Sequence, residues 1–276
     1  MSGGTLYVVA TPLGNLADLS DRARDVLRSA DLIAAEDTRV SRTLLAHVGG
    51  GARMVSVHAH APAAHTDRVL AALAQGRSVA LLTDAGTPGI SNPGATLARA
   101  ARAAGAGVIA VPGPSAVAAA LSISGLPADR YTFVGFLPRT GGARRRLLDQ
   151  VAASEWTVVL FEAANRLETL LADLAAGLGA KREGAVAREL TKMHEECRTG
   201  TLGELAGYYR EHPPKGEVTV MVAGRTVQPT STDPEAARTR ARELLATGAT
   251  RRDVAGRLAR ELAISRNAAY RLVTSL

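Results

Sequence analysis

The stretch best suited to binding chemistry follows a short apolar run in the first third of the chain. Asp84 comes directly after the uncharged run 79–82, and the sequence continues as Ala-Gly-Thr-Pro-Gly-Ile-Ser. Because these side chains are small, backbone N–H and C=O groups can approach a ligand closely, and the proline limits backbone freedom. The alternative is an ordinary strand-to-helix loop, since Gly and Pro mark most turns. One such loop is weak support for a binding site, but the chain contains three.

The other two loops have the same composition and also follow apolar runs. The loop 11–15, Thr-Pro-Leu-Gly-Asn, follows the run 5–10, and the loop 112–115, Pro-Gly-Pro-Ser, follows the run 108–111. None of the three loops contains G-x-G-x-x-G or the Gly-Lys-Ser/Thr of a P-loop. A site for nucleotide phosphates is therefore disfavoured.

Charged side chains of both signs follow a fourth apolar run. The segment 31–35, Asp-Leu-Ile-Ala-Ala, is the expected strand, and Glu36-Asp37-Thr38-Arg39 follows it. Because the carboxyl ends of parallel strands lie at one edge of a sheet, we expect acidic and basic groups to meet there.

Apolar runs alternate with helical segments in the first half, and this predicts the elements that hold the loops. Strands are expected at 5–10, 31–35, 54–57, 79–83 and 108–111, with helices between them. Such βαβ alternation is typical of a parallel sheet. Ligands bind at the carboxyl ends of the strands in such a sheet, which is where all three loops fall.

The pattern restarts near residue 131 and changes again after residue 225. We expect a first α/β lobe at 1–127, a second at 128–225, a linker at 226–233 and a basic helical tail at 234–276. Two short helices around a turn make the tail resemble a helix-turn-helix, and the alternative is a packing or dimerisation tail. The fold class predicted is α/β, with two lobes that share one cleft.

Composition limits the class of protein and its surroundings. The 276 residues are 46% hydrophobic but only 3% aromatic, so we expect a core of Ala, Val and Leu. The single cysteine, Cys197, excludes an internal disulfide and fits a reducing compartment. No signal peptide and no uninterrupted membrane-spanning stretch is expected, which favours a cytoplasmic protein. The net charge of +7 and the isoelectric point near 10.1 favour nucleic acid as partner, although genomic bias toward arginine has the same effect.

Six motifs follow one another in an order that resembles one family. Besides the three Gly/Pro loops, they are Glu-Asp-Thr-Arg at 36–39, Gly-Phe-Leu-Pro at 135–138 and Arg-Glu-Leu-Thr-Lys at 188–192. Together they resemble the tetrapyrrole methylase superfamily, in particular its members that modify ribosomal RNA. The resemblance implies two αβα lobes, a homodimer and S-adenosylmethionine bound between the lobes. It also implies methylation of the 2′-hydroxyl of a cytidine in the decoding region of 16S rRNA, within the small ribosomal subunit.

The resemblance and the positions of the loops together assign the contacts with S-adenosylmethionine. A cationic, polar ligand of this kind needs backbone groups and one or two carboxylates more than a phosphate cradle. The expected contacts are Pro12, Gly14, Asp84, Gly86, Thr87, Pro88, Ile90, Ser91, Ser115, Ala116, Phe161, Glu162 and Thr219. Asp84 is the expected carboxylate for the cationic end of the ligand, and its alternative role is an Asx-turn within its own loop.

The expected reaction is an in-line displacement of the methyl group, and it indicates which catalytic groups the site needs. Positioning supplies much of the rate, and no metal ion is expected. A ribose hydroxyl is a poor nucleophile while protonated, so we expect a general base and a cation that stabilises the developing alkoxide. The candidate bases are Glu36 and Asp37, and the candidate cations are Arg39, Arg188 and Lys192. The alternative is an Arg–carboxylate network that only braces the cleft.

Basic residues supply the expected contacts with RNA. Arg144, Arg145 and Arg146 form a concentrated positive spot suited to phosphates, and the alternative is a solvated helix face. The arginines of the tail would add to this positive surface.

Two other functions remain open from the sequence alone. One is a methylase of a tetrapyrrole or of a modified protein histidine within the same superfamily. The other is a DNA-binding regulator, in which the helix-turn-helix-like tail reads DNA and the α/β body senses a ligand.

Overall fold

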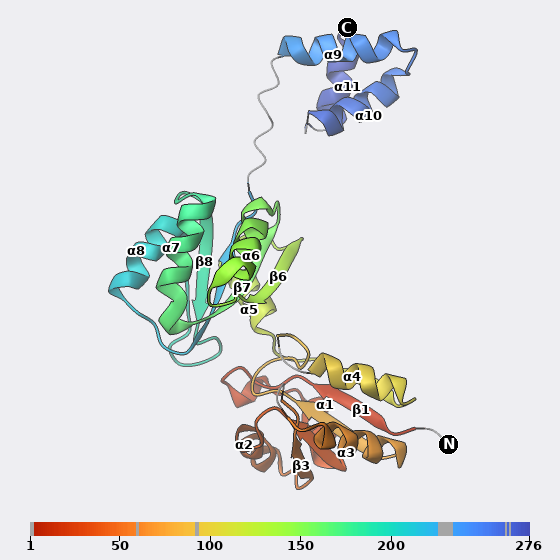
Figure 1. Cartoon of the computed structure of the whole chain (residues 1–276), viewed down its shortest axis with the longest axis vertical. Coiled ribbons are helices and arrows are strands. Elements are labelled where there is room, and N and C mark those ends of the chain that lie inside the picture. The colour runs from red at the N-terminus through yellow and green to blue at the C-terminus, as the bar shows by residue number, and fades with distance from the viewer. Residues whose placement is uncertain (1–2, 59–60, 92–93, 226–233, 263, 265) are drawn as a thin grey trace. The chain divides into compact units, whose positions relative to one another are not determined.

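The structure is a computed structural model that describes residues 3–58, 61–91, 94–225, 234–262, 264 and 266–276 (Figure 1). The chain forms two compact units, Met1–Ala223 and Gly224–Leu276. The linker expected at 226–233 lies outside the described residues.

The first sheet consists of parallel strands in the order β3-β2-β4-β1-β5. Its strands are β1 (Thr5–Val9), β2 (Leu32–Ala35), β3 (Arg53–Ser56), β4 (Ser78–Leu82) and β5 (Gly107–Val111). All of β2 and most of β4 are buried, because helices cover both faces of the sheet. The parallel sheet predicted from the βαβ alternation is confirmed.

Helices on the two faces of this sheet belong to two separate apolar cores. α1 (Asp21–Ser29) and α2 (Thr38–Val48) pack on the side of Ile33. α3 (Ala63–Ala74) and α4 (Gly94–Ala103) pack on the opposite side, against Leu81. The short 3-10 helix η1 (Leu16–Asp18) precedes α1. The first sheet is therefore the middle layer of an αβα lobe.

The second sheet is mixed, with the order β6-β7-β10-β8-β9. Only β6 and β7 are parallel, and the other neighbours are antiparallel. The strands are β6 (Tyr131–Phe136), β7 (Thr157–Ala163), β8 (Glu183–Arg188), β9 (Glu196–Thr201) and β10 (Glu217–Val222). The last strand of the body thus lies in the middle of its sheet.

Helices also cover both faces of the second sheet. α6 (Gly141–Ala153), α7 (Leu167–Leu178) and α8 (Leu202–Glu211) share a core with Leu160 and Val220. α5 (Ala116–Ser124) packs on the other face, against Val159 and Met221. Although α5 precedes residue 127, its contacts are with the second sheet. The predicted fold class, α/β with two αβα lobes, is confirmed.

The second unit is helical and has a core of its own. It consists of α9 (Pro234–Ala246), α10 (Arg251–Glu261) and α11 (Arg266–Thr274). The hydroxyl of Thr250 caps α10 by accepting a hydrogen bond from the backbone N–H of Asp253 at 3.2 Å. Leu258, Ala269 and Val273 are among the fully buried residues between the helices. None of the helices described in either unit is long and apolar enough to cross a membrane.

Candidate functional site

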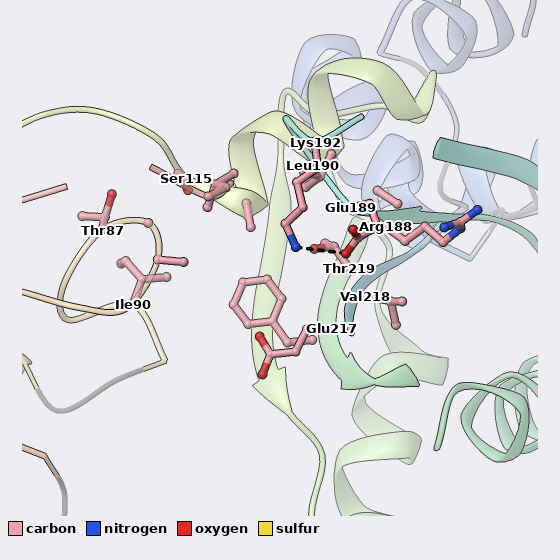
Figure 2. Close-up of a pocket in the computed structure, with 16 residues that line it drawn as sticks. Thr87, Ile90, Ser115, Arg188, Glu189, Leu190, Lys192, Glu217, Val218 and Thr219 are labelled. Carbon is pink, nitrogen blue, oxygen red and sulfur yellow. Dashed lines mark hydrogen bonds and ion pairs between the residues drawn. The ribbon is translucent and has the colours of Figure 1, made fainter. Parts of the chain in front are cut away.

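A cavity of about 290 Å³ lies where loops of the first lobe meet the second sheet (Figure 2). The first-lobe loops follow β1, β4 and β5, and they supply Leu13, Ala85, Gly86, Thr87, Ile90, Ser115 and Ala116. The other wall supplies Phe161, Ala187, Arg188, Glu189, Leu190, Lys192, Glu217, Val218 and Thr219. Residues far apart in the sequence therefore form one site.

The structure places the predicted site residues in two groups. Those that line the cavity are Gly86, Thr87, Ile90, Ser115, Ala116, Phe161, Thr219, Arg188 and Lys192. Those outside its lining are Pro12, Gly14, Asp84, Pro88, Ser91, Glu162, Glu36, Asp37, Arg39, Arg144, Arg145 and Arg146. Several members of the second group support the walls of the cavity.

Hydrogen bonds tie the three Gly/Pro loops to one another. The backbones of Thr11 and Gly86 exchange two hydrogen bonds, with N···O distances of 2.9 and 3.0 Å. The Thr11 hydroxyl, which is buried, donates to the carbonyl oxygen of Thr83 at 3.1 Å. The Thr87 hydroxyl donates to the carbonyl oxygen of Pro114 at 3.1 Å. The loops after β1, β4 and β5 thus form one continuous rim.

Two positions at this rim require glycine, one for its backbone conformation and the other for a close approach. Gly86 has a φ of +77°, and a Cβ there would lie 3.4 Å from Cδ2 of Leu13 and 3.7 Å from the carbonyl oxygen of Pro114. A Cβ on Gly14 would lie only 2.4 Å from Cγ of Lys192. The loop after β1 therefore contacts a side chain of the second lobe because residue 14 has no side chain of its own.

Pro12, Pro88 and Ser91 support the rim from outside the cavity. Pro12 directly follows the paired Thr11, and Pro88 is buried. Ser91 has a φ of 63°, and its hydroxyl would lie 3.1 Å from a Cβ on Gly135 of β6. The end of the loop after β4 is thus in contact with the second lobe.

The predicted bases form a network at the carboxyl ends of β2 and β4. The carboxylate of Glu36 accepts hydrogen bonds from the Thr83 hydroxyl at 2.5 Å and from the backbone N–H of Asp84 at 3.4 Å. The Asp84 carboxylate accepts from the backbone N–H of Asp37 at 3.0 Å. The Asp37 carboxylate pairs with the Arg39 guanidinium at 2.6 Å. These hydrogen bonds and the ion pair connect the carboxyl ends of β2 and β4 to each other.

Two carboxylates of this network have pKa values shifted in opposite directions. Burial raises the pKa of Asp84, and the nearby charges of Glu36 and Asp37 raise it further. Hydrogen bonds from the side chain and backbone of Arg39 lower the pKa of Asp37 to about 2. Among the described residues, no three His, Cys, Asp or Glu side chains are grouped so that they could hold a metal ion.

The loop after β8 brings charged side chains to the cavity. The Lys192 ammonium donates to the Glu189 carboxylate at 3.0 Å (Figure 2). Nε of Arg188 donates to the Glu196 carboxylate at 2.7 Å. Glu189 and Thr191 have φ values of 49° and 67°, in the left-handed region that residues with side chains rarely adopt. Backbone strain of this kind clusters at functional sites.

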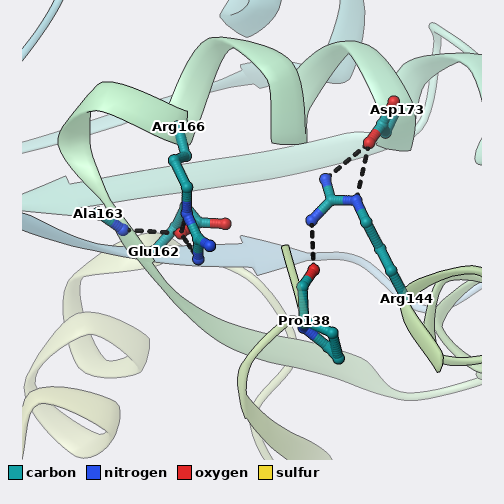
Figure 3. A network of polar contacts seen from close by, with 6 residues as sticks. All are labelled: Pro138, Arg144, Glu162, Ala163, Arg166 and Asp173. Atoms are coloured by element: carbon teal, nitrogen blue, oxygen red, sulfur yellow. Dashed lines mark hydrogen bonds and ion pairs between the residues drawn. The ribbon is translucent and has the colours of Figure 1, made fainter. Parts of the chain in front are cut away.

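Glu162 lies on the face of β7 opposite the cavity. Its carboxylate is fully buried and accepts hydrogen bonds from Nε of Arg166 at 2.6 Å and from the backbone N–H of Ala163 at 2.8 Å (Figure 3). Successive side chains of a strand point to opposite faces, so Phe161 faces the cavity and Glu162 does not.

The three consecutive arginines of α6 have different surroundings. The Arg144 guanidinium donates to the Asp173 carboxylate at 2.6 Å and to the carbonyl oxygen of Pro138 at 3.2 Å (Figure 3). Its side chain is only 12% exposed. Arg145 and Arg146 are exposed. The positive surface expected here therefore consists of Arg145 and Arg146, while Arg144 is bound within the lobe.

Sequence reasoning did not assign seven of the lining residues. They are Leu13, Ala85, Ala187, Glu189, Leu190, Glu217 and Val218. Glu217 could have been predicted from the sequence. It is two residues from Thr219 on a predicted strand, so the two side chains lie on the same face. Ala187 offered no chemical signal, and it lines the cavity because it pairs with Thr219 across β8 and β10.

Comparisons with known proteins identify the family of the chain. The sequence profile of the tetrapyrrole (corrin/porphyrin) methylases matches residues 5–206. A protein of Synechocystis sp. named ribosomal RNA small subunit methyltransferase I is 44% identical over 274 residues, covering 99% of this chain and 98% of that protein. The protein of the same name from Xylella fastidiosa (strain Temecula1) is 49% identical over 227 residues, covering 82% and 83%. That of Escherichia coli O157:H7 is 43% identical over 240 residues, covering 86% and 84%.

Solved structures show the same fold. Uroporphyrin-III-C-methyltransferase from Thermus thermophilus is 25% identical with a TM-score of 0.56, covering 79% of this chain and 94% of that one. The cobalamin biosynthetic enzyme cobalt precorrin-4 methyltransferase is 18% identical with a TM-score of 0.60 and the same coverage, a likeness of fold alone. The chain belongs to the tetrapyrrole methylases and, within them, to the family of the ribosomal RNA small subunit methyltransferase I proteins.

Proposed function

We propose that the protein is an S-adenosylmethionine-dependent methyltransferase that modifies the 2′-hydroxyl of a cytidine in the decoding region of 16S rRNA. Relatives that are 43–49% identical over most of the chain, and that bear the name of a small-subunit rRNA methyltransferase, support this activity. The observation that carries the proposal is the cavity itself. In it, side-chain-poor loops of the first lobe face Arg188, Lys192 and Glu217 of the second.

The lining of the cavity fits S-adenosylmethionine. Gly86 adds no side chain to the wall of the cavity, and its φ of +77° is one that residues with side chains rarely adopt. Phe161 supplies an apolar wall, and the exposed carboxylate of Glu217 suits the cationic part of the ligand. When bound, this ligand supplies a methyl group on a positively charged sulfur and leaves as S-adenosylhomocysteine. Pro12, Gly14, Asp84, Pro88 and Ser91, which lie outside the lining, act in this proposal by holding the loops in place.

The charged loop after β8 is the part proposed to act on the ribose hydroxyl. Lys192 stabilises negative charge on the oxygen, since an ammonium held in a cavity interacts strongly with a developing alkoxide. The Glu189 carboxylate lies 3.0 Å from this ammonium and takes the proton of the hydroxyl. Arg188 lies in the same lining and adds positive charge. Glu36, Asp37 and Arg39, which were the other candidates, brace the ends of β2 and β4.

Basic surfaces are proposed to hold the RNA by its phosphates. Arg145 and Arg146 supply one such surface on α6. From Gly224 onward the chain has ten arginines and five acidic residues, so this short unit holds most of the excess positive charge of +7. On α11, Arg266, Tyr270 and Arg271 are exposed. A cytoplasmic homodimer acting on the assembled small subunit completes the proposal.

The test is incubation of the protein with labelled S-adenosylmethionine and small ribosomal subunits that lack the modification. Mass spectrometry of RNA fragments then maps the labelled nucleotide. We expect one 2′-O-methylcytidine in the decoding region. Label in a free tetrapyrrole or a protein histidine would move the protein to the other branch of its superfamily. Specific binding to duplex DNA without any methyl transfer would favour the regulator instead.

A further inference from the structure

A second cavity, of about 430 Å³, adjoins the first. The two cavities share Arg188 and Glu189 at the end of β8. The second is completed by His194 and by residues at the end of α8 and in the loop that follows, including Tyr209, His212 and Lys215. The proposed reaction uses the first cavity and leaves the second without a role.

Tyr209 is one of the residues that line this second cavity, and its hydroxyl has no hydrogen-bond partner among the described residues. Tyr209 is only 2% exposed, and its oxygen is buried and unpaired. Buried polar groups are nearly always paired, because an unpaired one loses its hydrogen bonds with water. Burial and the charge of Glu196 raise the pKa of Tyr209 to about 12, so the hydroxyl is a donor at neutral pH. The oxygen is closed to solvent in this structure, so a ligand that supplies the acceptor must displace a side chain that covers the hydroxyl.

Flat side chains form a stack at the edge of this cavity. The Arg198 guanidinium lies 3.5 Å from the centre of the Tyr208 ring. The ring of His212 stacks on Tyr208, with 4.3 Å between ring centres and 12° between the planes. His212 is exposed, so its imidazole can extend the stack to a further planar group. Aromatic and guanidinium planes of this kind are surfaces on which unpaired RNA bases stack.

The charges around the second cavity favour an anion. Glu196 is already bound by two guanidinium groups, that of Arg188 at 2.7 Å and that of Arg198 at 3.2 Å. Glu189 is bound by Lys192. Lys215 is exposed and has no ion pair with any residue that the structure describes. Positive charge therefore remains available at the rim, as contact with a phosphate requires.

We propose that the second cavity binds a nucleotide of the substrate RNA that neighbours the methylated one. Its base stacks on His212, an oxygen of its base or ribose accepts the Tyr209 hydroxyl, and its phosphate lies at Lys215. This inference rests on the proposed function, because it adds a contact with the same RNA. It explains why two cavities share one charged loop.

The test compares full-length Tyr209→Phe, His212→Ala and Lys215→Ala proteins with the wild type. Methylation of small subunits is measured at saturating S-adenosylmethionine, and binding of S-adenosylmethionine is measured by calorimetry. We expect KM for subunits to rise roughly three- to tenfold in each variant, the loss of about one hydrogen bond or stacking contact. The Kd for S-adenosylmethionine stays unchanged. Tyr131→Phe and Lys181→Ala, which alter exposed residues outside both cavities, serve as matched controls.

Thermal unfolding separates this role from a purely structural one. Because Tyr209→Phe removes an unpaired buried hydroxyl, its Tm stays equal to or above that of the wild type while subunit binding weakens. An unchanged KM in all three variants would overturn the inference. So would a rise in KM that is accompanied by a lower Tm and weaker S-adenosylmethionine binding.

Failure of the proposed function has a different signature. If the wild-type protein transfers no methyl group to rRNA, the proposed activity fails. Fluorescence anisotropy with a labelled RNA oligonucleotide of the decoding region then still tests the second cavity. Weaker binding by Tyr209→Phe than by Tyr131→Phe would support the inference, and equal binding by the two would overturn it.

Discussion

The two walls of the first cavity are built from different materials. The first-lobe wall is held by backbone hydrogen bonds, such as the pair between Thr11 and Gly86, and presents few charged groups. The second-lobe wall presents charged side chains on a loop with a strained backbone at Glu189 and Thr191. A wall of fixed backbone groups suits binding by shape, and a wall of charges suits stabilisation of a reacting oxygen. The difference suggests a division of labour that mutations can test.

The largest effect is expected from Lys192→Met, which removes the ammonium but keeps a side chain against Gly14. Loss of one group that stabilises developing charge typically lowers kcat by about 10²- to 10³-fold. The Kd for S-adenosylmethionine should stay within about twofold, because the first-lobe wall is untouched. Single-turnover kinetics and calorimetry measure the two quantities, with Lys181→Met as the control. A kcat close to that of the wild type would remove Lys192 from the reaction.

A tenfold effect on binding is expected from Gly86→Ala in the opposite wall. Gly86 and Gly76 have nearly equal φ values, +77° and +78°, but a Cβ on Gly76 has no atom within 4 Å. Both alanine variants should lose about 1 kcal/mol of stability from backbone strain. Only Gly86→Ala should weaken S-adenosylmethionine binding, by roughly tenfold, which is about 1.4 kcal/mol. Equal binding by the two variants in calorimetry would show that the loop after β4 does not contact the ligand.

Asp37 and Asp84, in the network at the ends of β2 and β4, should affect the free energy of unfolding in opposite directions as the pH changes. The pKa of Asp37 is lowered from 3.8 to about 2 in the folded protein, so its ionisation stabilises the fold above pH 3.8 and this contribution is lost as the pH falls toward 2. The pKa of Asp84 is raised from 3.8, so its ionisation opposes folding once the pH rises past 3.8.

Urea unfolding from pH 7 down to pH 3 measures this contrast. At pH 7, Asp37→Asn should lower the free energy of unfolding and Asp84→Asn should raise it. Both differences from the wild type should shrink as the pH approaches 3. A change of the same sign in both variants would contradict the network described for β2 and β4.

The smallest effects concern neighbouring arginines of α6. Arg144→Ala should cost about 1 kcal/mol of stability, because its guanidinium is held by Asp173 and Pro138. Arg145→Ala should leave stability unchanged and reduce the salt dependence of RNA binding by a slope of about 1. Chemical denaturation and RNA titrations at several salt concentrations measure both. If Arg145→Ala lost stability and Arg144→Ala instead reduced the salt dependence of RNA binding, Arg144 and not Arg145 would contact RNA.

Local patterns of the sequence predicted the parts of the fold that depend on local physics. The strand that ends at Leu82 is uncharged and buried, and the loops at the ends of β1, β4 and β5 are rich in Gly and Pro and meet at one edge. Gly86 and Ser115 therefore line one cavity, as their positions suggested.

The order of the strands in the two sheets could not be predicted from the sequence, and this order decides which residues line the cavity. β2 pairs with β4 on the side away from β1, so Glu36 and Asp37 lie outside the cavity lining although they end a strand of the same sheet. β10 is inserted between β7 and β8, which brings Ala187 and Thr219 side by side. No periodicity in the chain encodes the order of strands, because that order follows from packing between distant segments.

A crystal structure of the protein with bound S-adenosylhomocysteine tests the central claim most directly. Our account predicts that the ligand contacts Gly86 and Ser115 on one side and Thr219 on the other. It also predicts that the former position of the methyl group faces Lys192. The account would be contradicted if electron density showed the ligand bound to other residues and only water in the cavity between these loops.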